Sequence, residues 1–241
     1  MSEFLILVKL LCAHFCSDFM LQTDRIYKGK SLGGPKGFFY HFLHSFTHAA
    51  TSYLFVAEWS NWLIPLVIFT THFVIDLIKY KCCPPCVAAF ITDQIAHVSV
   101  ILLLWFVLYG EGLQLFEGVT AADTLMVWLV VTAYLLVLKP SSILLGLFLK
   151  QWTPADGQSY SLPNAGQWIG YLERVLILTF ILIDCFEGVG FLLAAKSIFR
   201  FGELNKAKAI RITEYVLIGT MSSFAVAILV GVGTRCILLN L

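Results

Sequence analysis

The residues best suited to chemistry are histidines and aspartates spaced along four apolar stretches. Their patterns are His14-x-x-x-Asp18, His41-x-x-His44-x-x-x-His48, His72-x-x-x-Asp76 and Asp93-x-x-x-His97. On a helix, residues three or four apart lie on one face, so each stretch would present its set as a stripe. All six histidines of the chain fall between positions 14 and 97. The spacing therefore predicts that the four sets meet in one polar cluster.

Imidazole nitrogens and carboxylate oxygens together are typical ligands of divalent transition metals. An aspartate at hydrocarbon depth costs about 2.5–3.5 kcal/mol on insertion scales, and a bound cation would offset that cost. The predicted metal ligands are His14, Asp18, His44, His48, His72, Asp76, Asp93 and His97. We expect zinc first, with iron or manganese as alternatives, and either two ions or one ion with outer partners. A structural polar core and a proton or ion pathway are the other interpretations.

The composition places these stretches in a membrane. Of the 241 residues, 59% are hydrophobic and 13% are charged, and the mean hydropathy is +0.84. A soluble domain carries about 25% charged residues, whereas a spanning helix needs about 20 mainly apolar ones. The net charge of +1 provides no field that would favour nucleic acid as a partner. We therefore predict an all-α, polytopic transmembrane helix bundle whose main partner is the lipid bilayer.

Hydropathy predicts about seven helices, and their approximate ranges are 3–21, 39–57, 61–80, 87–110, 119–138, 169–199 and 210–238. Pro140 lacks a backbone donor, so the fifth helix should break there, and the apolar piece 143–149 is a candidate re-entrant segment. We expect a single membrane-embedded unit made of a four-helix metal-binding half, 1–110, and a C-terminal transmembrane half, 111–241.

Charges in the short loops predict the orientation. Lysine and arginine gather around 25–36 and 79–81, whereas the loops around 58 and 111–123 are acidic. The positive-inside rule then puts the basic loops in the cytoplasm and the N-terminus outside. This orientation brings all four polar sets to a similar depth, toward the cytoplasmic side. The basic loop around 200–211 also suits the cytoplasm, which requires one extra reversal of the chain, and the re-entrant piece would provide it.

Four further residues are candidates for roles in catalysis. Asp24 and His41, at the mouth of the cluster, could shuttle a proton. Lys196 and Arg200 share a helix face. They either anchor the chain at lipid headgroups or clamp a phosphate group of the substrate.

Several strings around these residues resemble an uncharacterised family of bacterial and phage membrane proteins, a domain of unknown function. The strings are HFCSDFMLQTD from His14, THFVID from Thr71, DQIAH from Asp93 and AKSIFRFGEL from Ala195. The resemblance covers nearly the whole chain, implies a bacterial inner membrane and brings no established activity. More distantly, the HxxxD pairs are similar to inner-membrane metal-dependent hydrolases and to the ligand pattern of zinc phospholipase C and P1 nuclease. The HxxxE pair and the N-terminal tryptophan ligand of that pattern have no counterpart here.

The leading hypothesis is a membrane-embedded metal-dependent hydrolase that acts on a phosphate or ester group near the cytoplasmic headgroup layer. A bound metal lowers the pKa of water to about 7, and a further cation would stabilise charge on the reacting oxygen. One alternative is a transporter or proton-coupled carrier that uses the His/Asp cluster as a transit site. Another is a membrane di-iron oxygenase, although the chain has no adjacent pair of histidines. A regulatory or assembly protein with a structural metal is the last.

Overall fold

A computed structural model of the chain describes residues 3–82, 86–110, 122–153, 164–198 and 207–241. Every regular element in these ranges is helical, which confirms the predicted all-α fold. The chain divides into two compact units, Met1–Leu135 with Leu241 and Leu136–Asn240. Each unit has its own packing and its own buried polar groups.

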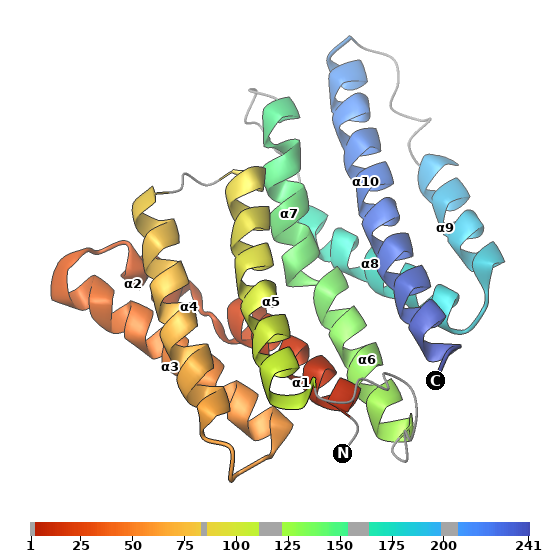
Figure 1. The fold of residues 1–241 in the computed structure, drawn as a ribbon. Helices are drawn as coiled ribbons and strands as arrows, with labels where there is room; N and C mark the ends of the chain where they lie inside the picture. Colours follow the sequence, from red (N-terminus) through yellow and green to blue (C-terminus); the bar gives the residue numbers. More distant parts are fainter. Residues whose placement is uncertain (1–2, 83–85, 111–121, 154–163, 199–206) are drawn as a thin grey trace. The chain divides into compact units, whose positions relative to one another are not determined.

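The first unit carries the predicted four-helix cluster. Its elements are α1 (Glu3–Phe15), a π-helix (Cys16–Leu21), α2 (Asp24–Lys30), α3 (Gly34–Val56), α4 (Leu63–Cys82), α5 (Val87–Tyr109) and most of α6 (Ala122–Val137) (Figure 1). α1, α3, α4 and α5 form a closed ring, because each contacts the next and α5 contacts α1. α2 packs against α3. Such a ring lets one face of each helix meet the other three.

The interior of this ring is apolar in one part and polar in another. Leu10, Ile64 and Ile101 belong to a buried core cluster contributed by α1, α4 and α5. The histidines of the same helices and of α3 are buried as well. Both parts follow from the helical spacing, which turns the polar stripe and the apolar residues next to it toward the same interior.

The second unit contains α7 (Lys139–Leu149), a 3-10 turn (Lys150–Trp152), α8 (Ala165–Leu182), α9 (Phe186–Ile198) and α10 (Ala207–Leu238). α8 packs against α10, and Ile177, Ile181, Phe224 and Ala227 form the buried cluster between them. Hydrophobic residues of α9 cover the same cluster.

The predicted single helix 169–199 is wrong, because α8 and α9 are separate helices. Asp184, between them, has a left-handed backbone conformation with φ of 65°. Lys196 on α9 pairs with Glu173 on α8, and both lie at similar chain distances from Asp184. The two helices are therefore antiparallel. The turn at Asp184 reverses the direction of the chain. The sequence analysis had expected one extra reversal, but at the apolar piece 143–149.

The predicted break near Pro140 is confirmed. α6 ends at Val137 and α7 begins at Lys139, and Leu138 between them has φ of −83° and ψ of −113°. Pro140 lies in the first turn of α7, where its missing N–H donor is tolerated. The re-entrant course proposed for 143–149 stays a prediction.

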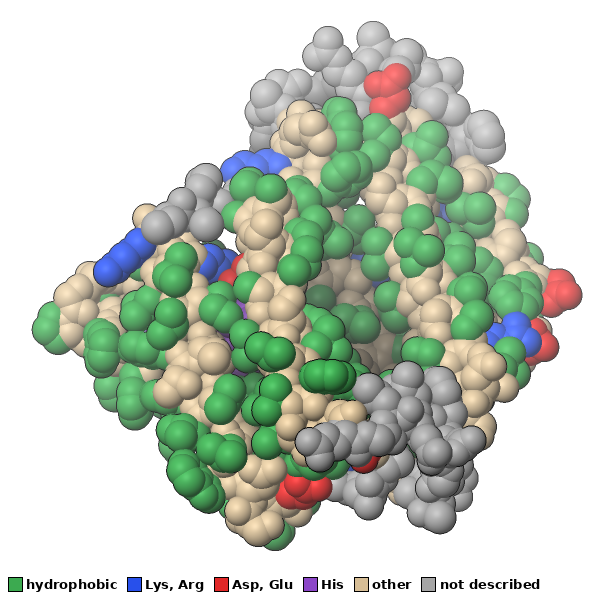
Figure 2. All heavy atoms as spheres, in the orientation of Figure 1, with side chains coloured by type: hydrophobic (Ala, Val, Ile, Leu, Met, Phe, Trp, Pro, Cys, Tyr) green, Lys and Arg blue, Asp and Glu red, His purple; other side chains and the backbone are tan. Residues whose placement is uncertain are grey.

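Six segments of the described residues are long and apolar enough to cross a membrane. They are Glu3–Leu21, Leu63–Lys81, Val87–Tyr109, Thr124–Trp152, Ala165–Leu182 and Thr213–Leu238. α3 has 23 residues, a sufficient length, but its inward-facing histidines and hydroxyl residues lower its hydropathy. Figure 2 shows hydrophobic side chains over the visible face of α4 and α5. Val74 on α4 and Leu103 and Val107 on α5 are exposed residues of these helices. Such a surface suits lipid and not water, so this is a membrane protein.

Candidate metal centre

Asp18 lies at a change of helix type in the first crossing. α1 ends at Phe15, and Cys16–Leu21 continue as a π-helix, whose wider turns alter the direction of the side chains. Sequence analysis predicted one helix over 3–21 without this change. His14, in the last turn of α1, keeps its Nε2 3.8 Å from Asp18 Oδ2. π-helical turns often occur at functional sites, and this one carries the carboxylate on which several histidines converge.

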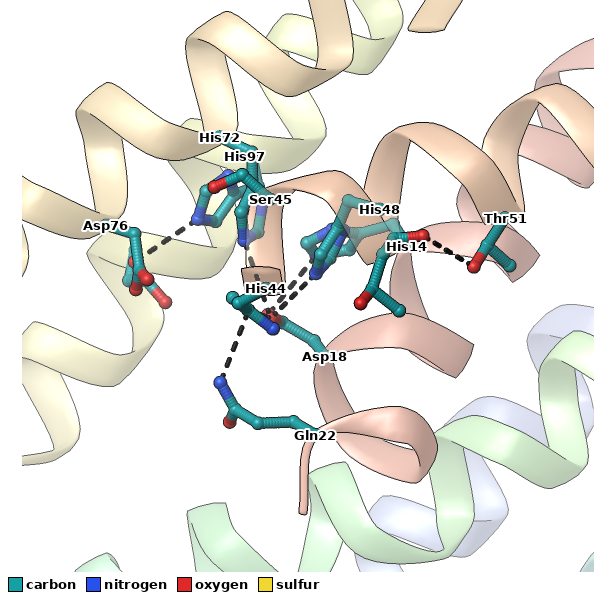
Figure 3. A network of polar contacts seen from close by, with 12 residues as sticks. His14, Asp18, Gln22, His44, Ser45, His48, Thr51, His72, Asp76 and His97 are labelled. Carbon is teal, nitrogen blue, oxygen red and sulfur yellow. Dashed lines mark hydrogen bonds and ion pairs between the residues drawn. The ribbon is translucent and has the colours of Figure 1, made fainter. Parts of the chain in front are cut away.

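Four side chains bring their ligand atoms together around Asp18. Asp18, His44, His48 and His72 each offer one nitrogen or oxygen, and these atoms all lie within 4.8 Å of one another. Asp18 Oδ1 lies 3.1 Å from His44 Nε2, 3.2 Å from His48 Nε2 and 3.8 Å from His72 Nε2 (Figure 3). Ligand atoms at about 2.1 Å from a tetrahedral zinc ion would lie roughly 3.4 Å apart. Small shifts would therefore let the four atoms surround one ion, and we call them the ligand group.

Two further histidines extend the ligand group into a series of rings. The His72 ring stacks on His48 at a centroid distance of 3.5 Å and on His97 at 4.1 Å. The His14 ring lies 5.2 Å from that of His97. A cavity of about 10 Å³ is lined by these four histidines, together with hydroxyl and apolar side chains. That volume accommodates about one water molecule.

The other two aspartates of the cluster are paired with lysines. Lys30 Nζ lies 2.6 Å from Asp76 Oδ2, and Lys79 Nζ lies 2.6 Å from Asp93 Oδ2. His41 Nδ1 also contacts Asp76 Oδ2, at 2.9 Å. Burial lowers the pKa of the Lys30 ammonium, and the Asp76 carboxylate opposes that shift. Asp76 and Asp93 thus have charge partners of their own at the border of the ligand group.

Asp18 has no such partner. In the part of the chain that the structure describes, no lysine or arginine nitrogen lies within ion-pair distance of its carboxylate, and only histidines do. Gln94 Nε2 donates a hydrogen bond to Asp18 Oδ2 at 3.1 Å. With uncharged imidazoles, the three aspartates and two lysines leave one negative charge, and it resides on Asp18. A cation held by the histidines would offset it.

Several buried polar atoms around the ligand group lack a hydrogen-bond partner. They are Ser17 Oγ, His41 Nε2, His44 Nδ1, His48 Nδ1, His72 Nε2 and Asp93 Oδ1. Each such atom costs about 1–3 kcal/mol, and native proteins contain few of them. His72 Nε2 is the informative one, because it lies 3.8 Å from Asp18 Oδ1 and an ion between the two atoms would give it a partner.

The structure brings together most of the predicted ligands. All four helices turn their histidines and aspartates inward. Six of these side chains line the cavity or belong to the ligand group: His14, Asp18, His44, His48, His72 and His97. Asp76 and Asp93 lie beside this group, where their lysines occupy them. Binding of a metal by any of these residues stays a prediction.

The residues assigned to proton transfer and to substrate have different surroundings. Asp24 is exposed on α2, whereas His41 is buried and directed at Asp76. Lys196, in the second unit, lies 2.6 Å from Glu173, which occupies its ammonium group. Arg200 lies outside the described residues. The roles proposed for these four side chains stay predictions.

Two residues of the cluster were not predicted as part of it. Lys30 and Lys79 served in the sequence analysis only as signals of orientation. Lys30 reaches the cluster because α2 lies close to α3, where a Cβ on Gly29 would be 2.4 Å from the Tyr40 ring. A signal existed for Lys79, which follows Asp76 by three residues and therefore shares its helix face.

Comparison with known proteins identifies the family. Residues 6–137 match a family described as a protein of unknown function, DUF3307. This range covers more than half of the 241 residues and contains all the cluster residues named above. No curated protein and no solved structure matches the chain at a significant level. The expected resemblance to an uncharacterised family is confirmed, and the chain belongs to the DUF3307 family of proteins of unknown function.

Proposed function

We propose that the chain is a membrane-embedded hydrolase that binds one divalent metal ion, zinc in the first place, at the ligand group. The observation that carries this proposal is the environment of Asp18. Its carboxylate is 12% exposed, is met by imidazole nitrogens and has no lysine or arginine partner among the described residues. Three imidazoles and one carboxylate form a set that zinc accepts readily, with iron and manganese as alternatives.

Hydrolysis is supported by the cavity beside the ligand group, which has room for a water molecule. A divalent ion there would supply Lewis acidity, and it would lower the pKa of a water molecule to about 7 where one coordination position is left to that water. The chain's own residues would divide the remaining tasks. Gln94 holds the Asp18 carboxylate in place through its Nε2. His14 and His97 line the cavity, so either imidazole is placed to take a proton from water.

We place this centre on the cytoplasmic side of a bacterial inner membrane, with the N-terminus outside. The basic loops around 25–36 and 79–81 support that orientation. Lys30 and Lys79 come from these loops or beside them, and both contact the cluster. The reacting group would then be a phosphate or ester close to the inner headgroup layer.

A transporter or proton-coupled carrier is the second candidate, and the series of imidazole rings favours it. Neighbouring ring centroids in this series are 3.5 to 5.2 Å apart. The order of the rings is His44, His48, His72, His97 and His14. A chain of buried titratable groups of this kind is typical of proton or ion pathways.

Elemental analysis of the purified protein, together with an assay of chromogenic phosphodiester and ester substrates, tests the proposal. We expect one zinc ion per chain and a hydrolytic activity that a chelator removes and added zinc restores. Asp24→Asn is the control variant for metal content, because Asp24 is exposed and is not one of the four residues of the ligand group. Protein without metal would refute the centre. Bound metal without hydrolysis, but with metal uptake into proteoliposomes, would favour the carrier.

A further inference from the structure

Two lysines from different elements converge on the rim of the ligand group. Lys30 comes from the end of α2 and Lys79 from the last turn of α4, and each Nζ lies 2.6 Å from an aspartate oxygen. The Lys30 side chain is 8% exposed, whereas that of Lys79 is 39% exposed. One ammonium group is therefore enclosed, and the other is accessible from outside the cluster.

Each of these ammonium groups has donors to spare. An ammonium carries three N–H donors, and within the described ranges each lysine forms an ion pair with a single carboxylate, Asp76 or Asp93. Burying a lysine in a membrane protein is costly, and intramembrane charges usually mark a function or a partner. The spare donors lie beside the place where the ion is proposed to bind.

The net charge of the cluster would change sign if a divalent ion bound to the ligand group. Three aspartates and two lysines give a net charge of −1 with uncharged imidazoles. A divalent ion at the ligand group would turn this into +1. A net charge in a desolvated interior is costly, so the loaded cluster favours one additional negative charge.

We propose that Lys30 and Lys79, together with the bound ion, form a binding site for a singly charged phosphodiester group. This inference rests on the proposed function and names its substrate class. A phosphodiester carries one negative charge and two non-bridging oxygens, which match the charge of the loaded cluster and the two ammonium donors. A neutral ester would leave the positive charge uncompensated, and a phosphomonoester dianion would overcompensate it.

The clamp predicted at Lys196 and Arg200 stays a separate prediction, because the site proposed here uses other lysines. Lys196 donates to Glu173, and that pair lies in the second unit. Lys30 and Lys79 belong to the same unit as the ligand group. The substrate cations are therefore assigned within the first unit.

A simpler role for the two lysines is to neutralise Asp76 and Asp93. Variants that remove a lysine together with its aspartate distinguish this role from contact with the phosphodiester. Lys79→Met combined with Asp93→Asn deletes one cation and one anion, so the net charge of the cluster is unchanged. A lysine that only neutralises its aspartate would then be dispensable for anion binding, whereas a lysine that contacts the anion would not.

The experiment uses the full-length protein in detergent, loaded with Co²⁺ and titrated with dimethyl phosphate while the visible absorption of the metal is recorded. We expect dimethyl phosphate to alter the spectrum of the wild type. In Lys79→Met/Asp93→Asn its Kd should rise more than about tenfold, as for the loss of one charge-assisted hydrogen bond. The matched control is Arg235→Met/Asp184→Asn, which removes a pair in the second unit and should bind like the wild type.

A second pair variant, Lys30→Met with Asp76→Asn, gives the same test should the first fail to fold. Cobalt content is measured in every sample, so loss of metal is distinguished from loss of the anion. Unchanged affinity in a folded, loaded pair variant overturns the inference and leaves the metal centre standing. Wild-type protein that takes up no cobalt overturns the proposed function itself.

Two further titrations identify the source and the charge of the ligand. Phosphatidylglycerol in mixed micelles carries the same phosphodiester within a lipid, and a response to it alone assigns the site to a headgroup. A response to dimethyl phosphate as well assigns it to the phosphodiester group in general. Tighter binding of the methyl phosphate dianion than of dimethyl phosphate would overturn the match to a single charge.

Discussion

Arg174 in the second unit and Asp18 in the first both hold a charge inside the protein, yet their partners differ. The Arg174 residue is 2% exposed. Its guanidinium donates to the carbonyl oxygens of Val137, at 2.5 Å, and Leu138, and to the hydroxyl oxygens of Ser142 and Ser223. Among the described residues, the break between α6 and α7 leaves the Val137 carbonyl without a helical donor, whereas the Leu138 carbonyl also accepts from the Ser142 N–H. A cation suits such a C-terminal end of a helix.

The surroundings of Asp18 are incomplete by comparison. It faces imidazoles that could each serve as a ligand, and His72 Nε2 beside it has no hydrogen-bond partner. Around Arg174 the donors and acceptors match, so the charge stabilises a particular backbone geometry. Around Asp18 hydrogen-bond acceptors predominate. The ligand group is therefore suited to bind a cation that the chain itself does not supply. The number of unmet partners, more than burial, separates a binding site from a structural network.

The largest effect that would test this comparison is expected from Asp18→Asn. The variant keeps the shape of the side chain but loses the negative charge and one oxygen ligand, so zinc affinity should fall by more than about 100-fold, beyond the 10–100-fold typical of an outer partner. Asp76→Asn, which alters an aspartate paired with Lys30, should stay within about 10–100-fold. Competition with a chromophoric chelator measures both affinities.

The ranking of these two variants decides which aspartate binds the ion. A larger loss from Asp76→Asn than from Asp18→Asn would move the ion toward His41 and Lys30. The charge balance described for the cluster would then be wrong. Circular dichroism of both variants shows whether either loss reflects unfolding.

Arg174→Met is expected to have the next largest effect, on stability alone. The substitution removes the donor of the Val137 carbonyl, at about 1–3 kcal/mol for a buried acceptor left unsatisfied, whereas Leu138 keeps its bond from the Ser142 N–H. Unfolding in mixed micelles would measure the loss, and the zinc content should equal that of the wild type. The control is Arg235→Met, whose pair with Asp184 is more exposed and contributes less. If Arg174→Met lost as much zinc as Asp18→Asn, the surroundings of Arg174 could not be distinguished from the ligand group as purely structural.

The sequence was sufficient for the four long helices that carry the cluster and for the convergence of their polar faces, because both depend on regular periodicity. His14, His44 and His97 share a helix face with the other polar residues of their own helices, because these are three or four positions away. Hydropathy predicts where each helix begins and ends, and hence the level of these residues in the bundle. The π-helix at Asp18 was not predictable, because it changes the hydrogen-bond register without a characteristic residue type. The lysine partners were missed for another reason: Lys30 depends on the tertiary packing of α2, which no local pattern encodes.

The turn between α8 and α9 shows how hydropathy can conceal a chain reversal. The segment around Asp184 is apolar enough to continue a helix, and the sequence analysis therefore predicted one helix over 169–199. Aspartate, however, tolerates the left-handed conformation, and Asp184 adopts it with φ of 65°. Its carboxylate then pairs with Arg235 Nη1 at 2.7 Å, near the end of α10. A single residue at the end of a helix can thus reverse the chain without proline or a polar loop.

Asp184→Asn should have the smallest effect, because it alters an exposed pair far from the ligand group in sequence. The Asp184 side chain is 64% exposed and that of Arg235 is 26% exposed, and such ion pairs contribute less than about 1 kcal/mol. Asparagine also accepts the left-handed conformation, so the turn itself should persist. We expect a nearly unchanged free energy of unfolding and unchanged zinc content, measured as for Arg174→Met.

Asp184→Val is the informative contrast, because a β-branched residue at positive φ is strained and should destabilise the turn by about 1–3 kcal/mol. A clear loss of zinc in Asp184→Asn would mean that the second unit contributes to the metal centre, against the separation of a ligand-binding network from a structural one.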